Sequence, residues 1–510
     1  MKLTKKILAI LLAVVVVLSM TVTAFAAEET YSITINNNVD NHTYEAYQIF
    51  SGDLHDGVLS NIVWGTGVTE AGKTVLGNAN TKAESLTDEN ATDFAKEVSA
   101  YLTDVCASTS TMADGVYVIS GLSAGYYLVK DKDNSLTGAD DSYTSYIIKV
   151  VNNVPVTPKS DKPVSQKKVK DINDSTETTK SDWQDSADHD IGDEVDFQLK
   201  GTVASNYDSY ETYYYAFHDK ECDGLTFDPS SVKVYVDGTL ITSNYEVVTE
   251  GLTDDCSFEV IFSDIKKISE VKADSVITVE YQSELNDNAV LGSLGNPNES
   301  YLEYSNNPNS SQSGGSGEGG EGEDKPETGK TPWDKVIVFT YKTIVNKVDA
   351  NSNPLTGAKF TLEKYNAKSE VWKTVDVVLN DDGTVFTFNG IDDGNYRLTE
   401  TKTPEGYNSI DPIYFAVTAE HDVLSDDPAL TSLEAVQTKA DGTNLTSGFV
   451  AVFSVNDTLG SLSTDIVNNT GSTLPSTGGV GTIALYVLGA VLVLGAIIVL
   501  IVKKRLSYEA

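Results

Sequence analysis

Short runs of alternating apolar and polar residues dominate the chain between residues 30 and 470. Val, Ile, Thr and Tyr fill these runs, and Gly, Asn and Asp interrupt them. A period of two places successive side chains on opposite faces of a strand, and β-branched and aromatic residues suit that geometry. The pattern therefore predicts an all-β chain built from Ig-like β-sandwich domains in tandem.

The predicted strands fall into three groups, because a chain of this length exceeds what one hydrophobic core serves. We expect an N-terminal domain over 28–156, a middle domain over 162–307 and a third domain over 333–469. The segment 308–332 is rich in Gly, Ser and Glu with almost no apolar residue, which predicts a flexible linker.

One helix is expected in the N-terminal domain between Asp88 and Leu102, with Thr87 as its N-cap. The clear strands of the middle domain are Glu194 to Leu199, Tyr213 to Phe217, Val232 to Val236, Phe258 to Phe262, Val276 to Tyr281 and Tyr301 to Tyr304.

Both ends of the chain carry targeting patterns. Three lysines precede an apolar run from Ile7 to Leu18, and Ala24-Phe25-Ala26 supplies a small-x-small cleavage site. Residues 1–26 are therefore predicted to be a secretory signal peptide.

At the other end, Leu474, Pro475, Ser476, Thr477 and Gly478 spell LPSTG. An apolar stretch over 480–502, long enough for a transmembrane helix, and a basic cytoplasmic tail over 503–510 follow it. This order resembles the cell-wall sorting signal of Gram-positive surface proteins. The resemblance implies that a sortase cuts between Thr477 and Gly478 and transfers the Thr477 acyl group to an amine, with peptidoglycan as the anchor.

The net charge is −39. The signal peptide carries three lysines and the segment after Thr477 a net charge of +2, so the mature chain carries −44. Such a chain repels nucleic acid, and we expect no nucleic-acid partner. Cys222 and Cys256 fall in one predicted domain and could form a disulfide, leaving Cys106 over.

A turn–strand unit occurs twice. Gly121-Leu-x-x-Gly-x-Tyr-x-Val-x-Asp131 aligns with Gly390-Ile-x-x-Gly-x-Tyr-x-Leu-x-Glu400, which suggests that the first and third domains share a fold. The second copy continues as YRLTETKTPEGY over 396–407. This resembles the E-box of Gram-positive pilins and collagen-adhesin B-type domains, YxLxETxAPxGY, with Thr403 where Ala is usual.

In that family a Lys of the first strand and an Asn of the last strand form an isopeptide bond. The resemblance assigns these roles to Lys347 and Asn468, with Glu400 as the acid that promotes the reaction. Burial disfavours the charged form of a lysine, which leaves a nucleophilic amine. Burial likewise favours a protonated Glu400, which can hydrogen-bond the Asn carbonyl and shuttle protons while ammonia leaves.

A second bond is expected in the middle domain. Lys167 shares a strand face with Val169 and is chosen as its lysine, with Lys168 close behind. Asn306 is preferred to Asn307, because it continues the face of Leu302 and Tyr304. Asp219 is the expected acid, since it shares a face with Tyr213, Tyr215 and Phe217, whereas its rival Asp196 alternates out of phase with its apolar neighbours.

The N-terminal domain is expected to lack such a bond, because no lysine occurs between the signal peptide and Lys73, and Asp131 is interpreted as a turn residue. The segment VPVTPK, ending at Lys159, resembles the pilin motif, VxVYPK in many relatives. Lys159 is then the amine that attacks the sortase-bound Thr477 of the next subunit, with Lys162 as the nearby alternative.

The whole pattern resembles a SpaA-type backbone pilin, which is not an enzyme in the turnover sense. The implied partners are a sortase, identical subunits joined head to tail, minor or tip pilins and peptidoglycan, on the surface of a Gram-positive cell. The alternatives are a singly wall-anchored adhesin that binds host matrix or glycans, and a secreted hydrolase. No catalytic motif supports the hydrolase. The five His are scattered, so no metal site and no cofactor is expected, and the sequence names no host ligand.

Overall fold

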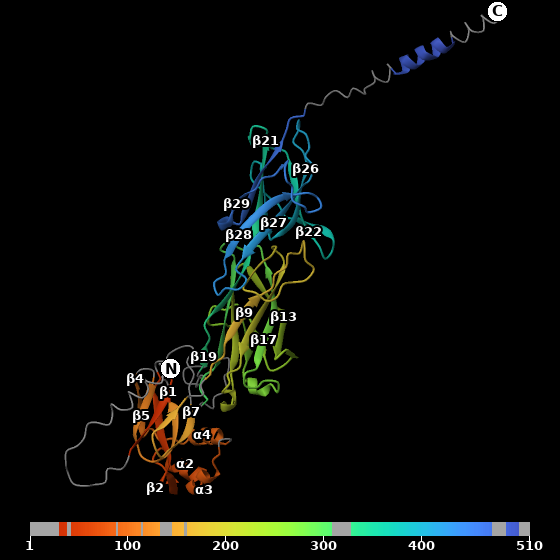
Figure 1. Cartoon of the computed structure of the whole chain (residues 1–510). Coiled ribbons are helices and arrows are strands. Elements are labelled where there is room, and N and C mark those ends of the chain that lie inside the picture. The colour runs from red at the N-terminus through yellow and green to blue at the C-terminus, as the bar shows by residue number, and fades with distance from the viewer. Residues whose placement is uncertain are drawn as a thin grey trace, which may run out of the picture.

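The computed structural model describes residues 30–37, 42–87, 90–113, 116–132, 145–157, 161–308, 328–471 and 486–498. The predicted signal peptide 1–26, the sorting pentapeptide 474–478 and the basic tail 503–510 lie outside these residues. Within them the chain is built mainly of strands, and the three predicted groups of strands follow one another end to end in an elongated molecule (Figure 1).

The N-terminal domain holds eight strands in the sheet order β7-β6-β2-β4-β5-β1-β8, with β3 paired to β2. Its elements are β1 Tyr31–Asn36, β2 Tyr44–His55, β3 Val58–Trp64, α2 Glu70–Leu76, α3 Ala79–Ser85, α4 Ala91–Ser99, β4 Ser108–Ala113, β5 Val116–Leu122, β6 Gly125–Asp131, β7 Ser145–Val150 and β8 Val154–Val156. Its helices lie together at the free end of the molecule (Figure 1).

Helix α4 falls within the predicted helical range, but Thr87 is not its N-cap. The helix begins at Ala91 and Asn90 occupies the cap position. The Asn90 side chain accepts a hydrogen bond from the backbone N–H of Thr87, 2.7 Å away, which ties the preceding turn. The two seven-residue helices α2 and α3 were not expected, since each is too short to show a helical period.

The middle domain packs two sheets face to face. One has the order β10-β20-β18-β12-β16-β15 with β19 paired to β18, and the other β14-β13-β17-β11-β9. The elements are β9 Ser165–Val169, β10 Ser186–Asp188, β11 Glu194–Thr202, η1 Tyr207–Ser209, β12 Tyr215–Glu221, β13 Leu225–Val236, β14 Thr239–Ile241, β15 Glu246–Val248, β16 Phe258–Phe262, η2 Ile265–Lys267, β17 Val276–Leu285, β18 Asn296–Ser305, β19 Thr328–Lys330 and β20 Asp334–Phe339.

The third domain is a sandwich of two five-stranded sheets, β24-β25-β21-β30-β29 and β23-β22-β26-β27-β28. The elements are β21 Tyr341–Asp349, β22 Lys359–Asn366, β23 Val371–Val375, β24 Val378–Leu379, β25 Val385–Ile391, β26 Gly394–Lys402, β27 Ile413–His421, β28 Leu430–Thr438, β29 Ser454–Asn456, η3 Asp457–Leu459 and β30 Ser461–Asn468.

The boundary between the last two domains differs from the predicted one. The strands β19 and β20 pair with β18, so residues 328–339 complete the middle sandwich although we placed them in the linker 308–332 and in the domain 333–469. Only Thr340 separates β20 from β21. The sequence conceals this join, because both strands are alternating runs and no turn residue stands between them.

The sequence repeat corresponds to a shared topology. In the N-terminal domain β1 pairs with β5 antiparallel and with β8 parallel, and in the third domain β21 pairs with β25 antiparallel and with β30 parallel. Gly121 and Gly390, at equivalent positions, have φ of +76° and +71°, a region that favours glycine. The first strand therefore lies beside the last strand in both domains.

A buried cluster of charged side chains joins the middle and third domains. Lys364, on β22, is 3% exposed, and its Nζ lies 2.7 Å from Asp174 and 3.0 Å from Asp190 of the middle domain. The same ammonium contacts Asp392 of its own domain. Because a buried charge is costly without partners, this contact holds the two domains against each other.

A second buried contact of the joint is formed by His421 of β27. Its Nε2 lies 3.6 Å from Asp171 and 3.7 Å from Asp188, and its Nδ1 lies 2.7 Å from the Ser186 hydroxyl. Burial alone would lower the pKa of His421, but the two carboxylates raise it to about 10. At neighbouring Asp393, burial and the charges of Asp188 and Asp171 raise the pKa to about 8.

The described part of the predicted membrane segment, 486–498, is helical. No helix within the described ranges has both the length and the apolar character that crossing a membrane requires.

The joint should weaken as the pH rises. A raised folded-state pKa means that the folded protein holds its proton more tightly, so the contribution of His421 is complete below about pH 6.5 and is lost as the pH passes about 10. Asp393 acts in the same direction, with its contribution lost through about pH 8. Thermal unfolding of the full chain measured between pH 6 and 10 should show a falling melting temperature.

The variant His421→Gln, which cannot titrate, should flatten this pH dependence. Equal pH profiles for the wild type and the variant would contradict the assignment.

Candidate functional site

Lys347, Glu400 and Asn468 meet inside the third sandwich. Lys347 on β21 and Asn468 on β30 belong to neighbouring parallel strands of one sheet and are fully buried. Glu400 is half-buried on β26 of the facing sheet. The two sheets thus bring together the lysine, acid and amide predicted from the E-box.

The amine of Lys347 lies in an apolar environment with few partners. Its Nζ donates to the carbonyl oxygen of Ile466 at 2.7 Å and to that of Val348 at 3.3 Å. Burial lowers the pKa of Lys347 to about 8, and the nearby Glu400 opposes this shift only in part. A substantial fraction of this amine is therefore neutral at physiological pH, which is what attack on an amide requires.

Glu400 holds the amide side chain in place. Its Oε2 accepts a hydrogen bond from Asn468 Nδ2 at 3.1 Å and another from the Thr403 hydroxyl at 2.9 Å. The residue that departs from the family pattern, Thr403, thus supports the acid. Glu400 Oε1 and Asn468 Oδ1 are buried without hydrogen-bond partners.

A second set of residues lies in the core of the middle domain. Lys167 of β9 contacts Asp219 of β12, and its Nζ also donates to the Tyr281 hydroxyl at 2.8 Å. That hydroxyl donates to Asp219 at 2.8 Å and accepts from Asn298 Nδ2 at 3.0 Å. Lys167, Asp219 and Asn298 are fully buried, and Tyr281 is 2% exposed.

Burial has the largest effect on the pKa values of Lys167 and Asp219. It lowers the pKa of Lys167 against the opposing charge of Asp219, and it raises the pKa of Asp219 against Lys167. Both shifts favour the neutral amine and the neutral acid. Next to them, burial and the Asp219 charge raise the pKa of Glu221 to about 7. Tyr281 and Glu221 were not expected from the sequence, because an isolated strand tyrosine or glutamate carries no distinguishing pattern.

The amide of the middle-domain set comes from Asn298, where the sequence analysis chose Asn306. Asp219 pairs with Ser300 on β18, so Asn298 lies two residues away on the same inward face. Asn306 follows the opposite end of β18, roughly 20 Å along the strand from Ser300. We expected this strand only over Tyr301 to Tyr304. Continuing its alternation backwards from Leu302 leads to Asn298.

The rivals considered for the middle domain lie elsewhere. Lys168 points to the other side of β9, where it pairs with Asp185 near the surface. Asp196 binds Lys180 and Gln282, 2.8 and 2.7 Å away. Lys168 and Asp196 are therefore not part of the set around Lys167.

The N-terminal domain has other residues at the positions of Lys347 and Glu400. The shared strand register places Asn37 where the third domain has Lys347. Asp131, at the position of Glu400, is fully buried at the end of β6 and lies 2.8 Å from His42 Nδ1. Its interpretation as a turn residue was therefore wrong. The expectation that this domain lacks an isopeptide bond stays a prediction.

The possible disulfide between Cys222 and Cys256 is not formed, and Cys106 is also a free thiol. Cys222 Sγ lies 3.9 Å from the Asn296 side chain. Cys256 belongs to the loop that places Asp254 beside His218. Membership of one domain was not sufficient, because the two thiols point to different neighbours.

Lys159 and the pentapeptide residues Leu474, Pro475, Thr477 and Gly478 lie outside the described residues. The strand before Lys159, β8, pairs with β1 and closes the N-terminal domain. Lys162, the alternative acceptor, is exposed at the start of the middle domain.

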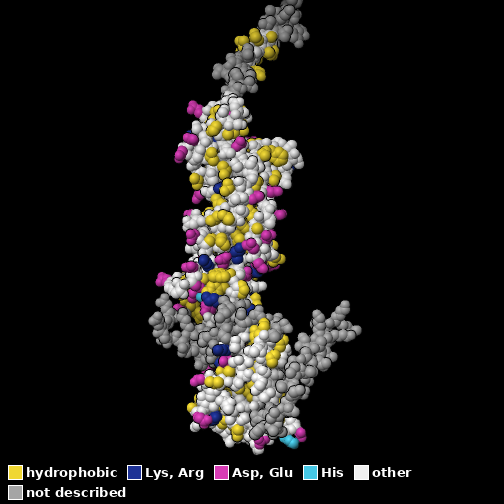
Figure 2. Space-filling model, turned by 90° about the vertical axis from the view of Figure 1, so that its left-hand side faces the viewer, with side chains coloured by type: hydrophobic (Ala, Val, Ile, Leu, Met, Phe, Trp, Pro, Cys, Tyr) yellow, Lys and Arg dark blue, Asp and Glu magenta, His cyan; other side chains and the backbone are white. Residues whose placement is uncertain are grey.

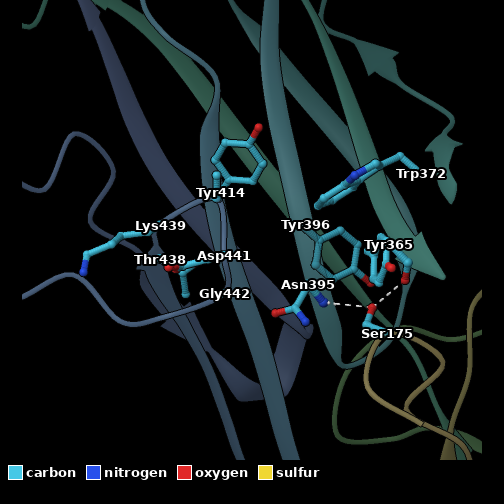
Figure 3. Close-up of a pocket in the computed structure, with 11 residues that line it drawn as sticks. Ser175, Tyr365, Trp372, Asn395, Tyr396, Tyr414, Thr438, Lys439, Asp441 and Gly442 are labelled. Atoms are coloured by element: carbon cyan, nitrogen blue, oxygen red, sulfur yellow. Dashed lines mark hydrogen bonds between the residues drawn. The ribbon is translucent and has the colours of Figure 1, made fainter. Parts of the chain in front are cut away.

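A cavity of about 350 Å³ opens on the third domain near the joint. The rings of Tyr365, Trp372 and Tyr414 line one side, and Lys439 and Asp441 come from the turn on the other (Figure 3). Ser175 of the middle domain closes its floor, where the Ser175 hydroxyl donates to Tyr365 O at 2.7 Å and accepts from Asn395 N at 2.9 Å. Figure 2 shows acidic side chains scattered over the described parts of all three domains on the visible face.

The chain is thus a tandem of β-sandwiches, two of which bring a buried lysine together with an acid and an asparagine. Residues 342–427 match the SpaA prealbumin-like fold domain, and residues 466–505 match the LPXTG cell wall anchor motif. The chain therefore carries the anchor of a cell-wall-attached surface protein.

Among known proteins, the trypsin-resistant surface T6 protein of Streptococcus pyogenes serotype M6 is 25% identical over 338 residues. The match covers 56% of this chain and 60% of the relative, so the chain spans about three fifths of the length of that relative. The solved structure of the T6 backbone pilin of Streptococcus pyogenes is described as modular, with three domains. It aligns with 88% of this chain and 100% of its own at 17% identity and a TM-score of 0.53, which supports the same fold.

Proposed function

We propose that this chain is the structural backbone subunit of a covalent cell-surface pilus. A sortase would cleave after Thr477 and join its acyl group to Lys159 of the next subunit, giving a head-to-tail fibre of identical chains. The observation that carries the proposal is the fold shared with a backbone pilin in a chain with an LPXTG anchor. Peptidoglycan would receive the base of the fibre, and minor pilins would complete it.

The domains of the subunit would be a signal peptide, three sandwiches and a sorting tail, with the middle sandwich extended to residue 339. We further propose that Lys347 bonds to Asn468 and Lys167 to Asn298, each with release of ammonia. In each reaction the amine attacks the amide carbon, and the neighbouring acid, Glu400 or Asp219, passes a proton to the leaving nitrogen. The support is the burial of both lysines and the hydrogen-bonded contacts of each amide.

A second candidate function is the binding of glycans by a wall-anchored adhesin. The cavity beside the joint offers three aromatic rings with polar groups opposite them, a combination that suits the apolar faces and hydroxyls of a sugar. Arg397 lies over the Trp372 ring at 4.7 Å and fixes the orientation of the indole. This function is compatible with polymerisation, since it uses a different part of the molecule.

Polymerisation should depend on Lys159. Wall extracts of cells that express the wild type should give a ladder of high multiples on a denaturing gel, because the intersubunit bond is covalent. Lys159→Ala should collapse the ladder to monomer, and Lys162→Ala, the matched control, should leave it intact. A ladder that survives Lys159→Ala would move the acceptor to another lysine, and monomer alone in the wild type, with the correct sortase present, would exclude the backbone role.

The internal bonds should appear as missing mass. Each bond releases one ammonia, so the intact secreted chain should be lighter than its sequence by about 34 Da for two bonds. Glu400→Ala or Asn298→Ala should each restore about 17 Da beyond the mass change of the substitution itself. Asn306→Ala serves as the control and should keep both bonds. A loss of one bond in this control, with none in Asn298→Ala, would reinstate the original choice of asparagine.

Glycan binding should require the aromatic cavity. Trp372→Ala removes the largest ring of the cavity and should reduce binding to a panel of neutral and sialylated oligosaccharides at least tenfold, as measured by fluorescence polarisation. Trp333→Ala removes a half-exposed indole that does not line the cavity and should have no effect. Equal binding by both variants, or none by the wild type, would remove this second function.

A further inference from the structure

A compact group of potential metal ligands lies on the outer face of the middle domain. His218 of β12 stands between Glu259 of β16 and Tyr301 of β18, which are its direct neighbours in the sheet. The loop before β16 brings Asp254 and Cys256 to the same imidazole. One ligand atom from each of His218, Asp254 and Cys256 lies within 4.8 Å of the others.

The carboxylates are concentrated around one imidazole. His218 Nδ1 lies 2.7 Å from Asp254 Oδ2 and 3.2 Å from Glu259 Oε1. On the other side of the ring, Nε2 lies 3.2 Å from Glu303 Oε2. Three carboxylates therefore lie beside the two ring nitrogens of His218. The Cys256 thiol, which has no disulfide partner, belongs to the same group.

The imidazole is buried and firmly oriented. It is 5% exposed and stacks on Tyr301 with ring centroids 4.4 Å apart. The Tyr301 hydroxyl in turn donates to Asp254 Oδ2 at 2.6 Å. His218 Nε2 lies 3.2 Å from Glu303 Oε2, so this carboxylate fixes the ring from the side opposite Asp254.

We propose that His218, Asp254 and Cys256 bind a thiophilic divalent cation, for which Zn²⁺ is the natural choice. Nitrogen, sulfur and carboxylate ligands in a four-coordinate arrangement are the set that zinc prefers. Glu259 is the nearest further carboxylate on the Nδ1 side and provides the fourth ligand. Glu303 then accepts from Nε2–H, as carboxylates commonly do behind a metal-bound histidine.

The geometry requires only a small adjustment. Ligand atoms at about 2.0–2.3 Å from a tetrahedral zinc lie roughly 3.3–3.8 Å apart, so Asp254 must withdraw slightly from Nδ1. Asp254 belongs to a loop, and its neighbour Asp255 already has a φ of +59°. Zinc replaces one proton on the imidazolium and one on the thiol, and both leave to solvent.

The arrangement of charges favours a cation here, because the carboxylates of Asp254, Glu259 and Glu303 lie 2.7–3.2 Å from the ring nitrogens of His218. Two further groups of acids occur among the described residues. Asp174, Asp190 and Asp392 already surround the Lys364 ammonium, and Asp171 and Asp188 lie beside His421 without a thiol.

Cobalt(II) provides the direct test, because a cobalt–thiolate bond gives an intense charge-transfer band in the near ultraviolet. The full chain, purified and titrated with Co²⁺, should develop this band at one equivalent and lose it on addition of Zn²⁺. Cys256→Ser should abolish the band and weaken Co²⁺ binding at least tenfold. Cys222→Ser, another half-buried thiol of the same domain, should retain both. Binding should weaken as the pH falls, since protons compete for both ligands.

Two further measurements distinguish a loss of metal binding from a loss of folding. Wild type and Cys256→Ser should melt at the same temperature in EDTA, and Zn²⁺ should raise the melting temperature of the wild type alone. Elemental analysis of the chain purified without chelator should find one zinc per molecule. Absence of the charge-transfer band in the wild type, or a band that survives Cys256→Ser, would overturn the proposal. So would the absence of zinc from protein purified without chelator.

Discussion

The cost of burying a lysine amine is the constraint on which the core of this molecule depends. Lys167 and Lys347 lie at the centre of two sandwiches, on the first strand of each, and burial lowers the pKa of both. An ammonium there would need several polar partners, and an uncharged amine needs fewer. The neighbouring acid and amide supply those contacts, so the residues that relieve the burial are the same residues that could react with the amine.

The joint between the middle and third domains also buries a lysine, but it keeps this lysine in its charged form. Lys364 is nearly as buried as Lys347, but it faces three carboxylates, and Asp392 and its neighbours raise its pKa well above the ordinary value even though burial alone would lower it. This lysine is therefore a stable cation and a poor nucleophile. The contrast shows that burial alone does not set the charge of a lysine, because the carboxylates around it can keep it protonated.

The proximity of Lys347, Glu400 and Asn468 could be predicted, because the E-box is a long contiguous pattern and the resemblance names the strands that carry its partners. The bond itself stays a prediction. The middle-domain site could be predicted only in part. Lys167 and Asp219 followed from alternation along single strands, but the choice of Asn298 depends on where β18 begins, and strand ends are weakly encoded. Tyr281 comes from a strand distant in sequence, so no local signal marks it. The extension of the middle domain to residue 339 was hidden for the same reason, since β20 continues into β21 without a turn.

The position of β20 has a mechanical consequence. With both proposed bonds in place, tension along a fibre would cross from Lys167 to Asn298 and, in the third domain, from Lys347 to Asn468, so that the strands between would carry none of it. Between these two bridges the covalent path leaves β18, passes through residues 309–327 and returns along β20, while the β18–β20 ladder provides a shorter parallel route. If that ladder opened, the 38 residues from Asn298 to Val336 would have to extend, and they could span up to roughly 125 Å before the backbone took the load. The subunit would then act as a rod with one extensible element in series, whose reach is set by the number of residues between the paired strands β18 and β20.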